Sequence, residues 1–343
     1  MEEQRVVRVP LPVQLIRRMD ALLLERKGGF ESRAEFIKEA VEAMVTEVQF
    51  GAAEGENPSL SAPFTEPEQP QSETPPEPFE LSSPATLDFT ELRAPSVDVE
   101  LIESGEATAV DDSLFGLHNR DYPSIWAAFK LWAHGRPLRF DHYRKLLVDD
   151  AWVFADRLGS IEREMNVKVS ALFPKNKDKP QASADSFFTF AVGSFTETLE
   201  GFRGVGPLFQ WRVCQLRRGT DGVEIGLTTE GLELLRSLEG LSLRLPHHEA
   251  AARLFLGHLR ADAPKDWWGF DLVLRRCFEP ATRADLVSAF GSERPEWKEN
   301  VVATNVAGYV ARAREWGLVN NKQVQGRYTL TPLGRTHVEG EGN

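Results

Sequence analysis

Three short motifs are of the kinds that catalyse reactions, bind metal ions or bind phosphate. Asp149-Asp150 is a carboxylate pair, but neighbours in a helical pattern point in different directions, which argues against a shared site. His247-His248 has no cysteine or carboxylate at ligand spacing, so we expect a surface pair rather than a metal site. Gly201 to Gly206 lacks the Lys-Ser/Thr of a phosphate-binding loop, which favours a turn. The sequence therefore predicts no enzyme activity, cofactor or metal.

Basic side chains offer a different chemistry, because they bind phosphate, and they are unevenly distributed. The formal net charge is −12, yet residues 51–114 alone hold 15 acidic side chains and one basic one, while residues 115–343 hold 31 basic and 28 acidic. Local faces rather than the total charge decide whether an anionic partner binds. Cys214 and Cys277 are isolated, so we expect no disulfide framework and a reducing cytoplasm.

The first fifty residues carry the pattern of one short strand and two helices. Arg5 to Leu11 alternates with period two, so that Val6, Arg8 and Pro10 share one face. Pro12 is suited to open a helix, which ends before Gly28-Gly29. Ser32, three residues before Glu35, forms a capping-box pattern at the start of a second apolar stripe. So short a unit buries too little surface to fold alone, and a homodimer with paired strands solves this problem.

This stretch resembles the ribbon-helix-helix family of Arc- and MetJ-like repressors over residues 5–48. Its most specific parts are the strand-Leu-Pro-helix start and the run from Gly28 to Val41. The resemblance implies a homodimer whose antiparallel ribbon enters the major groove of double-stranded DNA. It also implies that Val6, Arg8 and Pro10 contact bases and that Ser32 and Arg33 contact phosphate. Among the three base-contacting residues, only Arg8 can donate hydrogen bonds to guanine.

Residues 51–114 have the composition of a linker. Nine prolines fall between positions 51 and 112, and few apolar groups are available to offset chain entropy. We therefore predict a disordered acidic linker between domain 1–50 and the remainder. One segment inside it, from Leu87 to Ile102, mixes acidic and apolar residues, so it is either a solvated spacer or a segment that docks on a partner or on the body of this protein.

Beyond residue 114 the apolar periodicity returns, and all eight tryptophans lie beyond residue 120. Helices are predicted over 266–278, 282–290 and 300–316, followed by a hairpin with a polar turn, and a connecting helix over 246–259. The motif Leu-Thr-x-x-Gly occurs at 227–231 and again at 330–334. The order of elements is similar to that of winged-helix domains, and the recurrence indicates a diverged tandem repeat, with units at 115–240 and 241–343.

The winged-helix resemblance implies a second, weaker set of DNA contacts. By position these residues lie on the last helix before the hairpin, in the hairpin, or in a basic loop of the first unit: Lys298, Asn305, Tyr309, Arg312, Lys322, Arg327, Lys175 and Lys177. Winged helices also serve as protein-docking modules, so the body is expected to bind either DNA or a protein partner.

Together these patterns predict a mainly helical protein with short strands: a ribbon-helix-helix domain, a disordered linker and an α+β body of two winged-helix-like units. The predicted function is that of a dimeric, cytoplasmic, nucleoid-associated DNA-binding protein that regulates transcription. The alternative is a partner-binding adaptor of the antitoxin or DNA-partition type. No apolar stretch approaches membrane-spanning length, so no membrane partner is expected.

Overall fold

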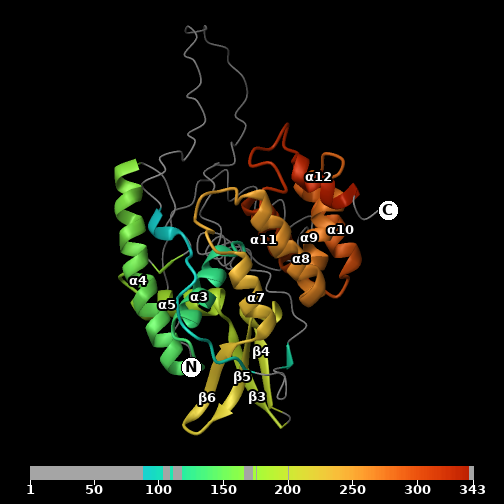
Figure 1. Cartoon of the computed structure of the whole chain (residues 1–343). Coiled ribbons are helices and arrows are strands. Elements are labelled where there is room, and N and C mark those ends of the chain that lie inside the picture. Colours follow the sequence, from blue (N-terminus) through green and yellow to red (C-terminus); the bar gives the residue numbers. More distant parts are fainter. Residues whose placement is uncertain are drawn as a thin grey trace, which may run out of the picture. The chain divides into compact units, whose positions relative to one another are not determined.

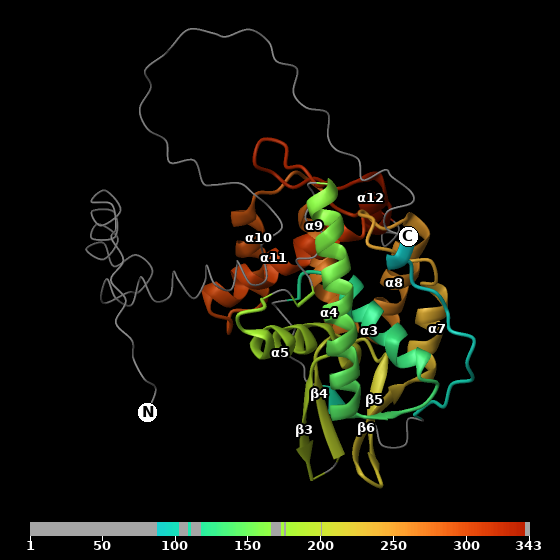
Figure 2. The same ribbon diagram turned by 90° about the vertical axis from the view of Figure 1, so that its left-hand side faces the viewer.

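A computed structural model of the chain describes residues 88–102, 109–110, 118–165, 173–174, 176–199 and 201–339 (Figures 1 and 2). All of them belong to one compact unit within residues 56–343. The described part is mostly helical and contains two small sheets, in agreement with the predicted mainly helical class. The predicted ribbon-helix-helix domain lies outside the described residues.

The first half of the body is built around α3 (Tyr122–Ala133). Ten of its twelve residues are buried, because the segment YPSIWAAFKLWA is apolar on nearly every face. The long helix α4 (Phe140–Met165) packs against it, and the hydroxyl of Tyr143 donates a hydrogen bond to the carbonyl of Ala127 at 2.8 Å. Two further helices, α5 (Pro180–Ala191) and α7 (Thr229–Ser237), also contact α3.

Two three-stranded sheets complete the described part of this half. In the first, β6 (Gly222–Leu227) pairs antiparallel with both β2 (Leu138–Arg139) and β5 (Cys214–Gly219), in the order β2-β6-β5. In the second the order is β1-β4-β3, with β1 at Ala109–Val110, β3 at Ser194–Thr198 and β4 at Gly201–Val205. The turn predicted for Gly201 to Gly206 is therefore wrong. The segment forms β4, and the turn falls after it, at Gly206, which begins the short helix α6 (Pro207–Gln210) with a φ of 121°.

The second half contains five helices: α8 (Glu249–Asp262), α9 (Pro264–Arg276), α10 (Arg283–Glu293), α11 (Glu299–Glu315) and α12 (Pro332–Glu339). The three helices predicted before the hairpin are confirmed as α9, α10 and α11. Thr282 and Asp285 form a reciprocal capping box at the start of α10. The predicted hairpin is present as bridges from Val319 to Leu330 and from Val324 to Arg327, and we call residues 318–330 the second hairpin.

Residues 88–102, which we call the strap, lie on the body. Its buried side chains are Thr90, 1% exposed, and Leu92 and Ile102, both 5% exposed. The backbone N–H of Leu92 donates to the carbonyl of Leu241 at 2.7 Å, and that of Ile102 donates to Leu227 at 2.9 Å. The disordered linker predicted to reach residue 114 is thus too long at its C-terminal end. Of the alternatives for this segment, docking on the body is the one observed.

The repeated motif Leu-Thr-x-x-Gly has the same local structure at both places. In the first, the N–H of Thr228 donates to the carbonyl of Val213 at 3.1 Å, and the Thr228 hydroxyl accepts from the N–H of Gly231 at 2.9 Å. In the second, the same two hydrogen bonds join Thr331, Leu318 and Gly334. A threonine therefore caps the helix that follows each hairpin, and the sequence recurrence is a structural recurrence.

Candidate functional site

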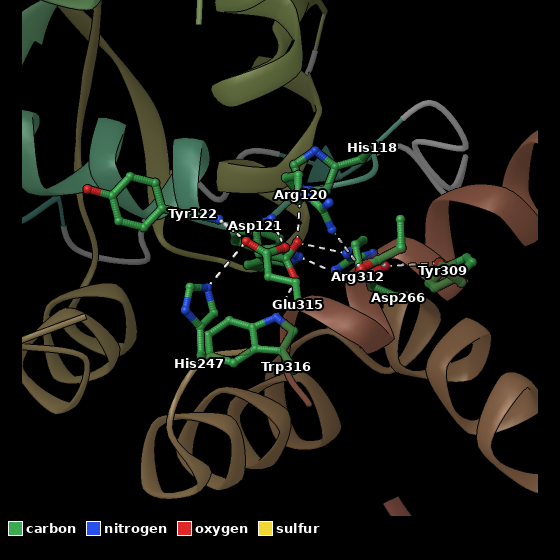
Figure 3. A network of polar contacts seen from close by, with 12 residues as sticks. His118, Arg120, Asp121, Tyr122, His247, Asp266, Tyr309, Arg312, Glu315 and Trp316 are labelled. Atoms are coloured by element: carbon green, nitrogen blue, oxygen red, sulfur yellow. Dashed lines mark hydrogen bonds and ion pairs between the residues drawn. The ribbon is translucent and has the colours of Figure 1, made fainter. Parts of the chain in front are cut away.

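A cluster of ionised side chains lies inside the body, between the first helix of the first half and the helices of the second (Figure 3). Asp121 precedes α3, Asp266 lies in the first turn of α9, and Arg312 lies on α11. Arg312 donates from Nε to Asp121 at 2.7 Å, and from its two terminal nitrogens to the two oxygens of Asp266 at 2.7 and 2.6 Å. We call these three residues the buried ion cluster, since none is more than 2% exposed.

Two tryptophans complete the cluster in a reciprocal way. Trp211, in the first half, donates from Nε1 to Asp266 in the second half at 2.9 Å. Trp316, in the second half, donates from Nε1 to Asp121 in the first half at 2.6 Å. Each tryptophan comes just before a residue with a left-handed backbone, Arg212 with a φ of 55° and Gly317 with a φ of 66°. The two halves are thus joined by equivalent contacts made in both directions.

Glu315 holds the start of α3 beside this cluster. Its carboxylate accepts hydrogen bonds from the N–H groups of Asp121 at 2.7 Å and Tyr122 at 3.1 Å, which would otherwise lack partners at a helix start. His247 Nε2 lies 3.3 Å from the same carboxylate. The surface pair predicted for His247-His248 is therefore half wrong: His247 is buried with an acidic partner from a distant helix, whereas His248 is exposed at the start of α8.

The electrostatics of the cluster follow from its burial and its pairing. Burial alone raises the pKa of Asp121, but the Arg312 guanidinium and the contacts with His118 and Trp316 outweigh it, so that pKa lies below its ordinary value. Burial lowers the pKa of Arg312, and the carboxylates of Asp121 and Asp266 more than reverse this effect. Burial also raises the pKa of Tyr309 well above its usual range. All three groups therefore keep their ordinary charge near neutral pH.

This arrangement suits holding the halves together better than it suits catalysis. Arg312 bridges two carboxylates that also accept hydrogen bonds from indoles, and Tyr309 donates to Asp266 at 2.9 Å. Within the described part of the chain, no group of histidine, cysteine or acidic side chains is arranged to hold a metal ion. A cavity of about 170 Å³ lies elsewhere, between the strap, α3 and α4, lined in part by Phe89, Trp126 and Phe154.

Several residues predicted to contact DNA lie outside the described part of the chain. These are the ribbon residues Val6, Arg8 and Pro10, the phosphate-binding pair Ser32 and Arg33, and Lys175 in the basic loop. Lys177, also in that loop, is exposed, and its ammonium group lies 2.9 Å from Asp156 on α4.

The residues predicted on α11 divide between the inside and the outside of the body. Lys298 is exposed just before the helix begins, whereas Asn305, Tyr309 and Arg312 are at most 4% exposed. The last two belong to the contacts around Asp266, and the amide of Asn305 donates to the carbonyl of Val301. The face of α11 that was expected to meet DNA is instead the face that the helix buries, and we do not retain these three residues as DNA contacts.

The two hairpins differ in how their basic side chains are paired. In the β5–β6 hairpin, Arg217 bonds to Glu224 at 2.8 Å and to Glu100 of the strap at 2.9 Å, and Arg218 pairs with Glu197. In the second hairpin, Lys322 and Arg327 are exposed, and no ion pair of the described residues involves either one. No acidic residue occurs between Glu315 and Glu339. Arg327 donates to the carbonyl of Pro280 at 3.1 Å, and, after the hydrogen bonds from Thr282, its charge helps to lower the pKa of Asp285, so the second hairpin is the one whose basic side chains form no direct ion pair among the described residues.

Comparisons of the chain with family models, with curated proteins and with solved structures find no match. In the part that the structure describes, no helix combines the length and apolar character needed to cross a membrane.

Sequence reasoning did not identify the buried ion cluster. It assigned no role to Asp121 or Asp266, and it predicted Arg312 as a DNA contact. One feature of the sequence could have pointed to the cluster. A tryptophan lies 17 residues before Thr228 and another lies 15 residues before Thr331, so both copies of the repeat contain a tryptophan at a similar distance from the motif.

Proposed function

We propose that the protein is a dimeric DNA-binding regulator of transcription. In this proposal residues 5–48 form a ribbon-helix-helix dimer whose outward side chains, Val6, Arg8 and Pro10, meet base edges. Ser32 and Arg33 bind phosphate at a helix start, where free N–H groups and the helix dipole favour an anion. The strap and the body then form a separate unit on the same chain, with the order of elements that the winged-helix resemblance implies.

The observation on the body that best supports this proposal is the charge contrast between its hairpins. Lys322 and Arg327 stand exposed in a stretch without carboxylates, in a chain whose formal net charge is −12. Exposed cations of this kind bind the DNA backbone and make affinity dependent on salt. In contrast, Arg217 and Arg218 form ion pairs with glutamates. The second hairpin is therefore the proposed secondary DNA contact, together with the exposed Lys298.

A second candidate function is that of a partner-binding adaptor, and the orientation of α11 favours it. The helix that would read bases in a winged-helix domain buries Tyr309 and Arg312, and its exposed positions include Glu299, Val301 and Ala307. Such a face offers little to DNA and suits a protein partner better. Co-purification of a stoichiometric partner would favour this candidate.

The test of the main proposal uses Arg8→Ala in the full chain. Genome-wide footprinting first identifies a preferred site, and affinity is then measured on that site and on random DNA. Loss of a bidentate contact to guanine costs about 1–3 kcal/mol, so affinity for the preferred site should fall more than affinity for random DNA. Arg5→Ala is the matched control, because alternation places Arg5 on the opposite face of the strand. Equal losses of Arg8→Ala on both DNAs would contradict the base-reading role.

A further inference from the structure

The cavity between the strap, α3 and α4 has an aromatic lining. Phe89 from the strap, Trp126 from α3 and Phe154 from α4 enclose a volume of about 170 Å³. The centroid of the Phe154 ring lies 5.3 Å from that of Phe89 and 5.5 Å from that of Trp126. Figure 1 shows the start of the strap beside α4. Since an apolar cavity of about 150 Å³ holds a benzene molecule, this cavity has room for a single six-membered ring.

Charged side chains also line this cavity, and helical spacing places them there. Four lining residues of α4 recur at the spacing of one helix face, which is the face toward the strap: Asp150, Val153, Phe154 and Arg157. Lys130, near the end of α3, is the remaining lining residue. Val153 is 72% exposed, so it lies at the open side of the cavity.

Two of the three rings are already covered by cations of the protein itself. The guanidinium of Arg157 lies 3.9 Å from the centroid of the Phe89 ring. The ammonium group of Lys130 lies 5.3 Å from the centroid of the Trp126 ring. These cations take the positions at which an aromatic cage would attract a positively charged ligand, and they would repel one. A cationic ligand is therefore disfavoured here.

An anionic ligand, in contrast, finds a cation that forms no ion pair. Lys130 pairs with Asp150 at 2.6 Å, whereas no ion pair among the described residues involves Arg157. A guanidinium that stacks on a ring keeps its N–H groups free in its own plane, where they match the two oxygens of a carboxylate. Two cations and one carboxylate leave the lining with a net charge of +1. We propose that this cavity binds a small aromatic carboxylate, with its ring among the three aromatic side chains and its carboxylate on Arg157.

Such a ligand would stabilise the docking of the strap. Phe89 belongs to the strap and the other lining residues belong to helices, so the site is complete only when the strap lies on the body. A ligand that binds only the docked form shifts the equilibrium toward that form. The N–H of Leu92, which donates to the carbonyl of Leu241 at 2.7 Å, reports docking through its rate of hydrogen exchange. The inference does not depend on DNA binding by residues 5–48.

The test titrates the full chain with benzoate and follows binding by ligand-observed NMR. Benzoate should saturate the protein below about 10 mM, the weak limit for a ligand of its size. Benzylamine, with the same ring and the opposite charge, and acetate, without a ring, should not saturate it. Arg157→Gln should weaken benzoate binding about 3- to 10-fold, and Arg253→Gln, at another exposed arginine, should leave it unchanged. Equal binding of benzylamine and benzoate, or no saturation by benzoate, would overturn the proposal.

A pair of substitutions at Val153 locates the site without disturbing the core, because this side chain is 72% exposed. Val153→Glu places a carboxylate at the open side of the cavity and should weaken benzoate binding, whereas Val153→Lys should preserve or strengthen it. Equal affinities of the two variants would refute the location. Benzoate should also slow hydrogen exchange at the N–H of Leu92 in the native chain. Unchanged exchange there at saturating benzoate would contradict the contact with the strap.

Discussion

The indole nitrogen of Trp211 lies 2.9 Å from the carboxylate of Asp266, so that a residue just before one hairpin contacts the first turn of a helix in the other half of the body. The equivalent contact from Trp316 to Asp121 runs in the opposite direction. Arg312 lies between the two aspartates and bonds to both. The halves are therefore coupled through one buried ion cluster, and its perturbation should affect both together.

Replacement of Arg312 by methionine should destabilise the whole body. The change leaves two buried carboxylates without their cation, and removal of one partner from a buried pair costs about 3–5 kcal/mol. Urea denaturation followed by tryptophan fluorescence measures the loss in the free energy of unfolding. Arg253→Ala is the control, because the pair of Arg253 with Glu249 is about half exposed and is worth less than about 1 kcal/mol. Similar losses for both variants would argue against a central role of the cluster.

Acid should weaken the stabilising contribution of Asp121. Since its pKa in the folded state lies below the ordinary value of 3.8, the contribution is fully present above that value and is lost as the pH falls below it. The difference in free energy of unfolding between the native chain and Asp121→Asn should therefore be constant from pH 5 to 7 and shrink as the pH falls toward 3. Denaturation curves at pH 6, 5, 4 and 3 test this, and a difference that grows on acidification would reverse the assigned sign.

The glycines of the repeated motif should not tolerate alanine. A Cβ at Gly231 would lie 2.2 Å from the carbonyl oxygen of Val213, and one at Gly334 would lie 2.1 Å from that of Leu318. Each substitution should cost about 1–3 kcal/mol or more, as expected for overpacking against backbone. Gly257→Ala in α8 is the matched control, because its Cβ would meet nothing within 4 Å, and it should stabilise the chain by up to about 1 kcal/mol. Thermal melts of the three variants distinguish these outcomes.

Neutralising the second hairpin should reduce the salt dependence of DNA binding. If Lys322 and Arg327 each contact a phosphate, the double alanine variant should lower the slope of log affinity against log salt by about 2. The double alanine variant of Arg217 and Arg218 is the control and should change the slope little, because these side chains are engaged by glutamates. Equal slopes for the native chain and both variants would mean that neither hairpin touches DNA.

Local patterns were sufficient to predict the elements but not the buried ion cluster. The periodicity of α9 to α11 depends on near neighbours, and the helices predicted from it are confirmed. Arg312 was predicted to contact DNA because of its position in the winged-helix resemblance. Its partner Asp121 is 191 residues away in the sequence, and no local pattern encodes such a pairing. For the same reason Glu315 was not foreseen as the partner of His247.

Because the strap docks on the body, fewer residues connect the proposed DNA-binding domain to the body than the sequence predicts. The described part of the body begins at Asp88 rather than beyond residue 114, and about 40 residues separate Asp88 from Val48. At roughly 3.5 Å per residue, their fully stretched span is at most about 140 Å, close to the length of 40 base pairs of B-form DNA. When the first fifty residues of one chain bind an operator, the connecting residues could therefore carry the start of the body at most about that far along straight DNA, and sites much farther away would require the duplex to loop.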